Sequence, residues 1–88
     1  MASKKLLKFY ASWCGPCKIY NKTWDKVIPS YEDQLTVENI DIDKDTSGLA
    51  VKHKIETVPT TLLIREDGSE LKKTGRLSAD ELTELILS

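Results

Sequence analysis

The stretch Trp13-Cys14-Gly15-Pro16-Cys17 carries the strongest signal for both fold and chemistry. It places the only two cysteines of the chain three residues apart, directly after an apolar strand-like run and at the start of a helix-like one. Two thiols at this spacing can close into a disulfide and reopen. The first sulfur is expected to be exposed at a helix N-terminus, where the helix dipole stabilises a thiolate. The spacing therefore predicts redox chemistry, with a structural disulfide or a metal-binding pair as the alternatives.

The composition is that of an ordinary globular domain. The chain has 88 residues, of which 40% are hydrophobic and 31% charged, enough for one domain with a small core. Thirteen basic and fourteen acidic residues leave a net charge of -1, so neither a nucleic acid nor a membrane is expected as a partner. The first residues lack the apolar stretch of a secretory signal. We expect a single cytoplasmic domain over residues 1–88, a monomer that needs no metal or cofactor.

Four segments have the composition of β-strands. They cover residues 6–10, 35–42, 60–65 and 70–74. The alternation of apolar residues slips once within the second segment, so either a bulge interrupts it or both faces of the strand are partly covered. The pair Asp67-Gly68 between the last two segments marks a hairpin, which makes them antiparallel neighbours.

Three segments predict helices. The first begins at the cysteines and is expected to end or kink at Pro29. Its apolar positions recur at steps of three and four and are Cys17, Tyr20, Trp24, Val27 and Ile28. A short helix is expected at 47–53, and Ser78 with Glu81 forms a capping box that starts the last one. The order β-α-β-α-β-β-α predicts an α/β fold, a four-stranded mixed sheet with helices on both faces.

The motif Trp-Cys-Gly-Pro-Cys-Lys at 13–18 resembles the active site of thioredoxins, and the resemblance extends over residues 6–85. The segment 9–12 resembles the family's strand that leads into the motif. Val58-Pro59-Thr60 resembles the segment with its cis-proline, and Thr74-Gly75 the turn before its last helix. No counterpart of the initial strand and helix of ordinary thioredoxins precedes Leu6. The resemblance implies a minimal thioredoxin fold and a protein-disulfide reductase.

The spacing and the resemblance together suggest a role for each cysteine. Cys14 is expected to be the nucleophile that attacks a substrate disulfide, and Cys17, on the buried stripe, the resolving cysteine that completes the exchange. The residues expected to contact the substrate are Trp13, Gly15, Pro16, Val58, Pro59 and Gly75. The resemblance further implies disulfide-containing proteins as substrates and an NADPH-dependent thioredoxin reductase as the electron donor.

Lys8 departs from the family pattern. Ordinary thioredoxins carry a buried Asp six residues before the first motif cysteine, and this chain has Lys8 there. A Lys near the sulfurs would favour a thiolate or, with its pKa depressed by burial, would act as a base. In the other arrangement, the absence of the N-terminal segment exposes Lys8 and its stem lies along the surface. We favour the exposed arrangement and keep Lys8 as a candidate for tuning the cysteines.

Three other functions compete with this assignment. A glutaredoxin-like oxidoreductase reduced by glutathione suits Thr57-Val58-Pro59 equally well, although Gly-Pro between the cysteines favours a thioredoxin. A zinc module usually needs four Cys or His ligands, whereas the chain has two cysteines and His53. An interaction protein could keep the fold without turnover, and the presence of both cysteines argues against it.

Overall fold

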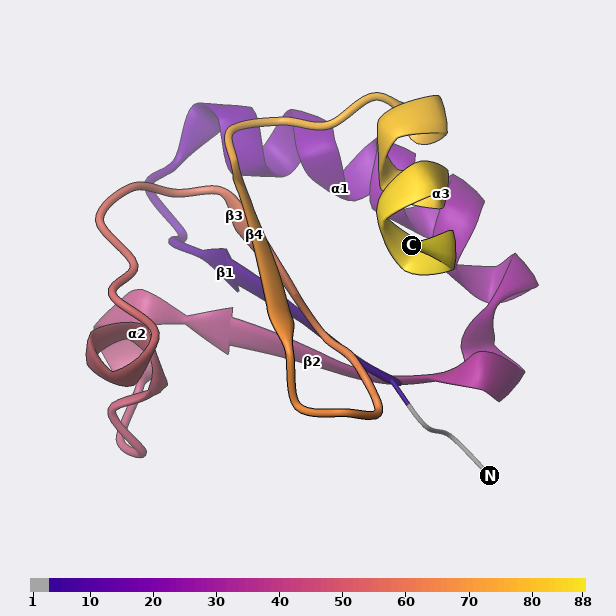
Figure 1. Ribbon diagram of the computed structural model, residues 1–88. Helices are drawn as coiled ribbons and strands as arrows, with labels where there is room; N and C mark the ends of the chain where they lie inside the picture. The colour runs from indigo at the N-terminus through magenta and orange to yellow at the C-terminus, as the bar shows by residue number, and fades with distance from the viewer. Residues whose placement is uncertain (1–3) are drawn as a thin grey trace.

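The computed structural model describes residues 4–88 and contains one four-stranded sheet with helices on both faces (Figure 1). The strands are β1 (Lys4–Tyr10), β2 (Leu35–Asp41), β3 (Thr60–Ile64) and β4 (Glu70–Thr74). The α-helices are α1 (Gly15–Val27), α2 (Leu49–Lys52) and α3 (Ala79–Leu87). Short 3₁₀ helices are η1 (Ile28–Ser30), η2 (Glu32–Gln34) and η3 (Ile42–Lys44). The predicted order β-α-β-α-β-β-α is confirmed.

The sheet is mixed, as predicted, and its strand order is β2-β1-β3-β4. β1 therefore lies inside the sheet, parallel to β2 and antiparallel to β3, and β4 lies antiparallel to β3 at an edge. The predicted hairpin joins β3 to β4. Its Gly68 has φ of 88°, a left-handed conformation that glycine adopts without steric cost. The Gly68 N–H donates to the Arg65 carbonyl at 2.9 Å and closes the turn.

The slipped alternation in β2 reflects two partly covered faces. The register of β2 with β1 runs without interruption from Leu35 to Asp41, so no bulge intervenes. Leu35 and Val37 pack into the cluster that also contains residues of α1 and α3. Ile40, which points to the opposite face, packs into the second cluster beside Leu49 of α2. Of the two predicted alternatives, coverage on both faces is the correct one.

Alternation along β1 separates the two core clusters. Leu6 faces α1 and α3, whereas Leu7 and Phe9 face the side on which α2 lies. Figure 1 shows α1 and α3 together on one side of the sheet and α2 on the other. Lys8 has the same parity as Leu6, so it projects toward α1.

The last helix starts at the predicted capping box. The Glu81 N–H donates to Ser78 Oγ at 3.1 Å, and the Ser78 N–H donates to Glu81 Oε1 at 2.9 Å. Leu77 and Leu82, on either side of the cap, are buried in the same cluster, and this holds the entry of α3 against the sheet. The preceding turn is thereby fixed near the start of β3, where the Gly75 N–H donates to the Pro59 carbonyl.

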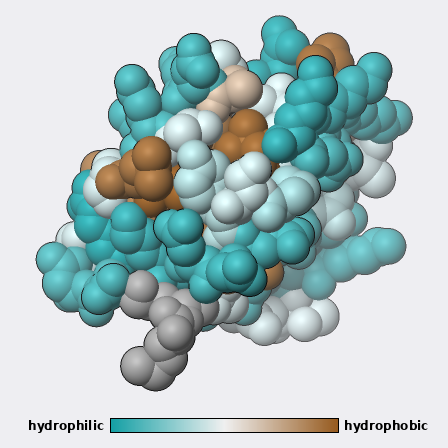
Figure 2. All heavy atoms as spheres, turned by 90° about the vertical axis from the view of Figure 1, so that its right-hand side faces the viewer, coloured by the Kyte–Doolittle hydropathy of each residue, from teal (hydrophilic) through white to brown (hydrophobic). Residues whose placement is uncertain are grey.

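The side of the molecule that lies to the right in Figure 1 is largely hydrophilic, and its apolar side chains form separate patches (Figure 2). Within residues 4–88, no helix has both the length and the apolar character needed to cross a membrane.

Candidate active site

The two cysteines lie where β1 passes into α1. Cys14 is the N-cap residue of α1, with extended backbone angles, and Cys17 lies in the first turn. A disulfide joins them, with their Cα atoms 5.3 Å apart. The Cys17 N–H donates to Cys14 Sγ at 3.2 Å, and Pro16 occupies a first-turn position where no N–H is needed. The Cys14 sulfur thus accepts the hydrogen bond that a helix N-terminus offers to an anion.

Both cysteines are covered in this disulfide form. Cys14 is 4% exposed and Cys17 is 2% exposed, and both pack against Ala11 and the partly buried Val58. The prediction that the first sulfur is exposed and only the second shielded is therefore wrong for the oxidised site. The reason is that Val58 covers Cys14, with its carbonyl oxygen 3.7 Å from Cys14 Sγ.

The segment containing Pro59 lies directly beside the disulfide. The Val58–Pro59 peptide bond is cis, as the family resemblance implied. The Gly75 N–H donates to the Pro59 carbonyl at 2.8 Å, so the turn before α3 adjoins the same segment. The structure thus connects Cys14, Val58, Pro59 and Gly75 through direct contacts, although they are far apart in the sequence.

Exposed residues surround the disulfide. Trp13 is 67% exposed, and Gly15 and Pro16 are exposed beside it. Trp13 Nε1–H donates to Asp43 Oδ2 at 2.8 Å, which ties the indole to η3. Sequence analysis missed Asp43, because an acidic run such as 41–45 carries no sign of which carboxylate meets the indole. The indole is thus held in place while its surface stays open to solvent.

Lys8 is buried beneath α1, so the expected exposed arrangement is wrong. Lys8 is 6% exposed, its Nζ donates to Asn21 Oδ1 at 2.5 Å, and Nζ lies 4.7 Å from the centroid of the Trp24 ring. Burial lowers the pKa of Lys8, while the nearby Asp25 carboxylate acts in the opposite sense and more weakly. The cause of the burial is topological: β1 is an inner strand, and α1 covers the face from which Lys8 projects.

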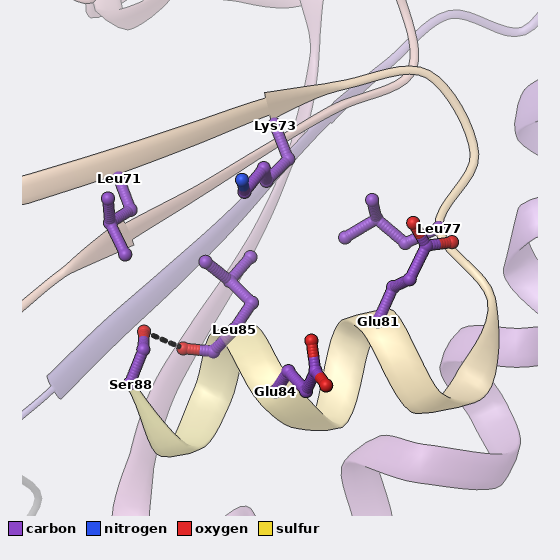
Figure 3. A pocket seen from close by; sticks show the side chains of 7 residues that line it. All are labelled: Leu71, Lys73, Leu77, Glu81, Glu84, Leu85 and Ser88. Carbon is purple, nitrogen blue, oxygen red and sulfur yellow. Dashed lines mark hydrogen bonds between the residues drawn. The ribbon is translucent and has the colours of Figure 1, made fainter.

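A groove of about 240 Å³ lies between β4 and α3, away from the cysteines (Figure 3). The residues that line it are Leu71, Lys73, Leu77, Glu81, Glu84, Leu85 and Ser88. Cys14 and Cys17 instead lie among exposed residues of the α1 N-terminus, an arrangement that suits a polypeptide lying across the surface. Among residues 4–88, no group of three or more His, Cys, Asp and Glu side chains is placed to hold a metal ion.

Comparison with known proteins identifies the family. The family model described as Thioredoxin matches residues 1–88. A thioredoxin of Buchnera aphidicola is 35% identical over 88 residues, which cover 98% of this chain and 80% of the relative. A thioredoxin of Borreliella burgdorferi is 31% identical over 81 residues, which cover 92% of this chain and 68% of the relative. The solved structure of the germline-specific thioredoxin Deadhead from Drosophila melanogaster superposes with a TM-score of 0.83 at 30% identity, covering 98% of this chain and 80% of that one.

These similarities agree with the geometry of the site. The thioredoxin alternative is favoured over the glutaredoxin one, since the matched family and the relatives are thioredoxins. Disulfide-containing proteins are the substrates that this family implies. With a redox-active disulfide between Cys14 and Cys17, the chain is a thiol–disulfide oxidoreductase that belongs to the thioredoxin family.

Proposed function

We propose that the chain reduces disulfides in other proteins, with Cys14 as the nucleophile and Cys17 as the resolving cysteine. The observation that carries this assignment is the position of Cys14 as the N-cap of α1, where the Cys17 N–H points at its sulfur. A hydrogen bond and a helix dipole both lower the pKa of a thiol, and only the thiolate attacks a disulfide. Cys17 lies on the inner face of the same helix and has no such cap.

The exchange proceeds in two steps. The Cys14 thiolate attacks one sulfur of the substrate disulfide, a Cys14–substrate bond forms, and the other substrate sulfur leaves as a thiolate that takes up a proton. Cys17 then loses its proton and attacks Cys14. The mixed disulfide breaks, the second substrate thiol is released, and the Cys14–Cys17 bond closes. Two electrons pass from the protein to the substrate, and the oxidised protein then awaits reduction.

The proposed substrate-binding surface consists of six residues near the disulfide. They are Trp13, Gly15, Pro16, Val58, Pro59 and Gly75. An extended substrate segment could pair with the backbone at Val58, as strands do in β-augmentation. Gly75 has φ of 82° and a Cβ there would meet no neighbouring atom within 4 Å, so the glycine suits the turn and leaves open room for a substrate backbone.

The proposed physiological setting follows from the family and the composition. We place residues 1–88 in the cytoplasm as one monomeric domain, reduced by an NADPH-dependent thioredoxin reductase and acting in electron transport for redox homeostasis. The nearly balanced charge supports neither a nucleic acid nor a membrane as partner. Insulin reduction tests the donor: turnover with NADPH and thioredoxin reductase is expected to exceed turnover with glutathione, and the reverse order would assign the donor to glutathione.

Trapping tests the roles of the two cysteines. Cys17→Ser is expected to accumulate a mixed disulfide between Cys14 and the substrate, visible as a covalent complex on a non-reducing gel. Cys14→Ser is the matched control, since it leaves one thiol of the pair and should trap little. If Cys14→Ser traps as much complex as Cys17→Ser, the assignment of nucleophile and resolving cysteine is wrong.

A further inference from the structure

Lys8 is the one charged residue that is buried among residues 4–88. It stands in a polar row that crosses the sheet beneath α1. The strand register places Lys8 opposite Asn39 in β2 and opposite Thr61 in β3, and residues directly opposite one another in paired strands project from the same face. Thr61 is hydrogen-bonded to Tyr20, whose hydroxyl lies 2.7 Å from Thr61 Oγ1. The thiol–disulfide exchange at Cys14 and Cys17 uses none of these groups.

The row lies close to the resolving cysteine. Cys17 and Asn21 are four residues apart on α1, so their side chains are neighbours on one face of the helix, with about 5–6 Å between Cβ atoms. Asn21 is the residue that accepts the hydrogen bond from Lys8. On β1, Tyr10 lies two residues after Lys8 and therefore on the same face of the sheet. Tyr10 packs against the cluster that contains the two cysteines. Asn21, which holds the Lys8 nitrogen, is therefore about one helical turn along α1 from Cys17.

Burial lowers the pKa of Lys8, but three neighbouring groups act in the opposite direction and favour its charged form. The Asn21 side-chain oxygen can only accept, and the face of an indole ring attracts a cation. Lys8, Tyr10, Asn21, Trp24, Asp25 and Asn39 line a depression of about 320 Å³. The titratable side chains beside Lys8 in this depression are Tyr10 on β1 and Asp25 on α1, and Tyr20 on α1 meets the same row at Thr61. The other charged residues of α1, Lys18, Lys22 and Lys26, are exposed, and Asn39 and Thr61 are neutral. Asp25 adds attraction for an ammonium ion.

We propose that the Lys8 ammonium, held by Asn21 and Trp24, stabilises a thiolate at Cys17 and thereby shifts the cysteine pair toward its reduced form. A disulfide carries no charge, so a fixed positive charge stabilises only the reduced pair, and only once a thiol ionises. A stabilised reduced form makes a dithiol protein a weaker reductant. Lys8 would also raise the fraction of Cys17 that is ready to resolve the mixed disulfide. The inference rests on the proposed function, because it needs Cys14 and Cys17 to cycle.

Equilibration with glutathione measures this shift. Two glutathione molecules give two electrons and two protons to the Cys14–Cys17 disulfide, whose S–S bond breaks into two thiols, while one S–S bond forms in oxidised glutathione. A Cys17 thiol that ionises then releases its proton to solvent. The ratio of reduced to oxidised protein across a series of glutathione buffers gives the equilibrium constant at each pH.

We compare the wild type with Lys8→Met, Lys8→Arg and Lys22→Met between pH 6 and pH 8.5. Lys8→Met is expected to shift the equilibrium toward the disulfide about tenfold at pH 8.5, equivalent to a potential about 30 mV more negative. The shift should shrink toward pH 6, where the thiols are protonated. Lys8→Arg should stay near the wild type. Lys22→Met removes an equal charge from an exposed position next to Asn21, where water and salt screen it, and should have no effect.

Three results would overturn the proposal: an equilibrium constant for Lys8→Met within twofold of the wild type at pH 8.5, a shift of equal size at every pH, or an equal shift in Lys22→Met. Should Lys8→Met not fold, Lys8→Gln removes the same charge while keeping a polar tip beside Asn21. A wild type that forms no disulfide and reduces no insulin would instead refute the proposed function. A wild type that is active, with Lys8→Met unchanged in potential, refutes this inference alone.

Discussion

The hydrogen bond between Tyr20 and Thr61 ties the helix that carries the cysteines to the strand that follows Pro59. The two hydroxyl oxygens are 2.7 Å apart and both residues are fully buried. Tyr20→Phe keeps the ring and removes only the hydroxyl, so Thr61 Oγ1 is left without this partner. A buried polar group that loses its partner costs about 1–3 kcal/mol. We expect the free energy of unfolding of the oxidised protein to fall by about that amount.

A double-mutant cycle separates this hydrogen bond from packing. Thr61→Val removes the second hydroxyl and nearly keeps the shape, so the double variant has no unsatisfied group at this position. Its loss of stability should be smaller than the sum of the two single losses, with a coupling of about 0.5–3 kcal/mol. Urea unfolding of the oxidised proteins, followed by circular dichroism, measures each free energy. For a domain of this size, about 1 kcal/mol corresponds to about 4–8 °C in Tm.

Tyr31→Phe is the matched control for this cycle. Tyr31 is a partly buried tyrosine packed against the same core cluster, and its hydroxyl has no hydrogen bond to the described residues 4–88, so the same atom is deleted without orphaning a partner. Its stability should stay close to that of the wild type. Additive single losses, or a Tyr20→Phe protein as stable as Tyr31→Phe, would refute the reasoning from buried hydrogen-bond satisfaction.

Three further outcomes are expected. Burial raises the pKa of Tyr20 from 10.0 to about 12. Because the pKa is higher in the folded state, the protonated tyrosine stabilises the fold fully below pH 10, and this stabilisation is lost as the pH rises from 10 to 12. The free energy of unfolding of the wild type should therefore fall by up to about 3 kcal/mol more than that of Tyr20→Phe over this range. Ser78→Ala removes the acceptor of the Glu81 N–H and should cost about 1 kcal/mol in a thermal melt, whereas Ser30→Ala at an exposed site should not. Asp43→Ala frees the Trp13 indole and should raise KM for insulin about threefold, as expected for one exposed hydrogen bond, with an unchanged potential.

The elements that local patterns specify were predicted closely. The predicted fourth strand, 70–74, coincides with β4, and the last helix starts at the capping box of Ser78 and Glu81. Such features depend on hydrogen bonds and backbone preferences within a few residues, which can be identified in the sequence. The pairing of Cys14 with Cys17 is equally local, because one helical turn brings the two sulfurs together.

Long-range packing produced the results that the sequence pattern did not predict. The covering of Cys14 by Val58 and the contact of Trp13 with Asp43 join segments on different elements, and no spacing rule connects them. The cis-proline and Gly75 were placed at the site only through family resemblance. The burial of Lys8 went against expectation, because a charged residue in a strand pattern gives no indication of which helix will cover it.

The sequence by itself determined the redox pair, the order of the elements and the caps of its helices, since these depend on interactions between residues close in the chain. Only the tertiary structure decided what surrounds the pair. β1 became an inner strand through pairing with β2 and β3, and α1 packed across it. That packing buried the Lys8 amine beside Asn21, one helical turn along α1 from Cys17. This juxtaposition depends on sheet order and register rather than on any local signal.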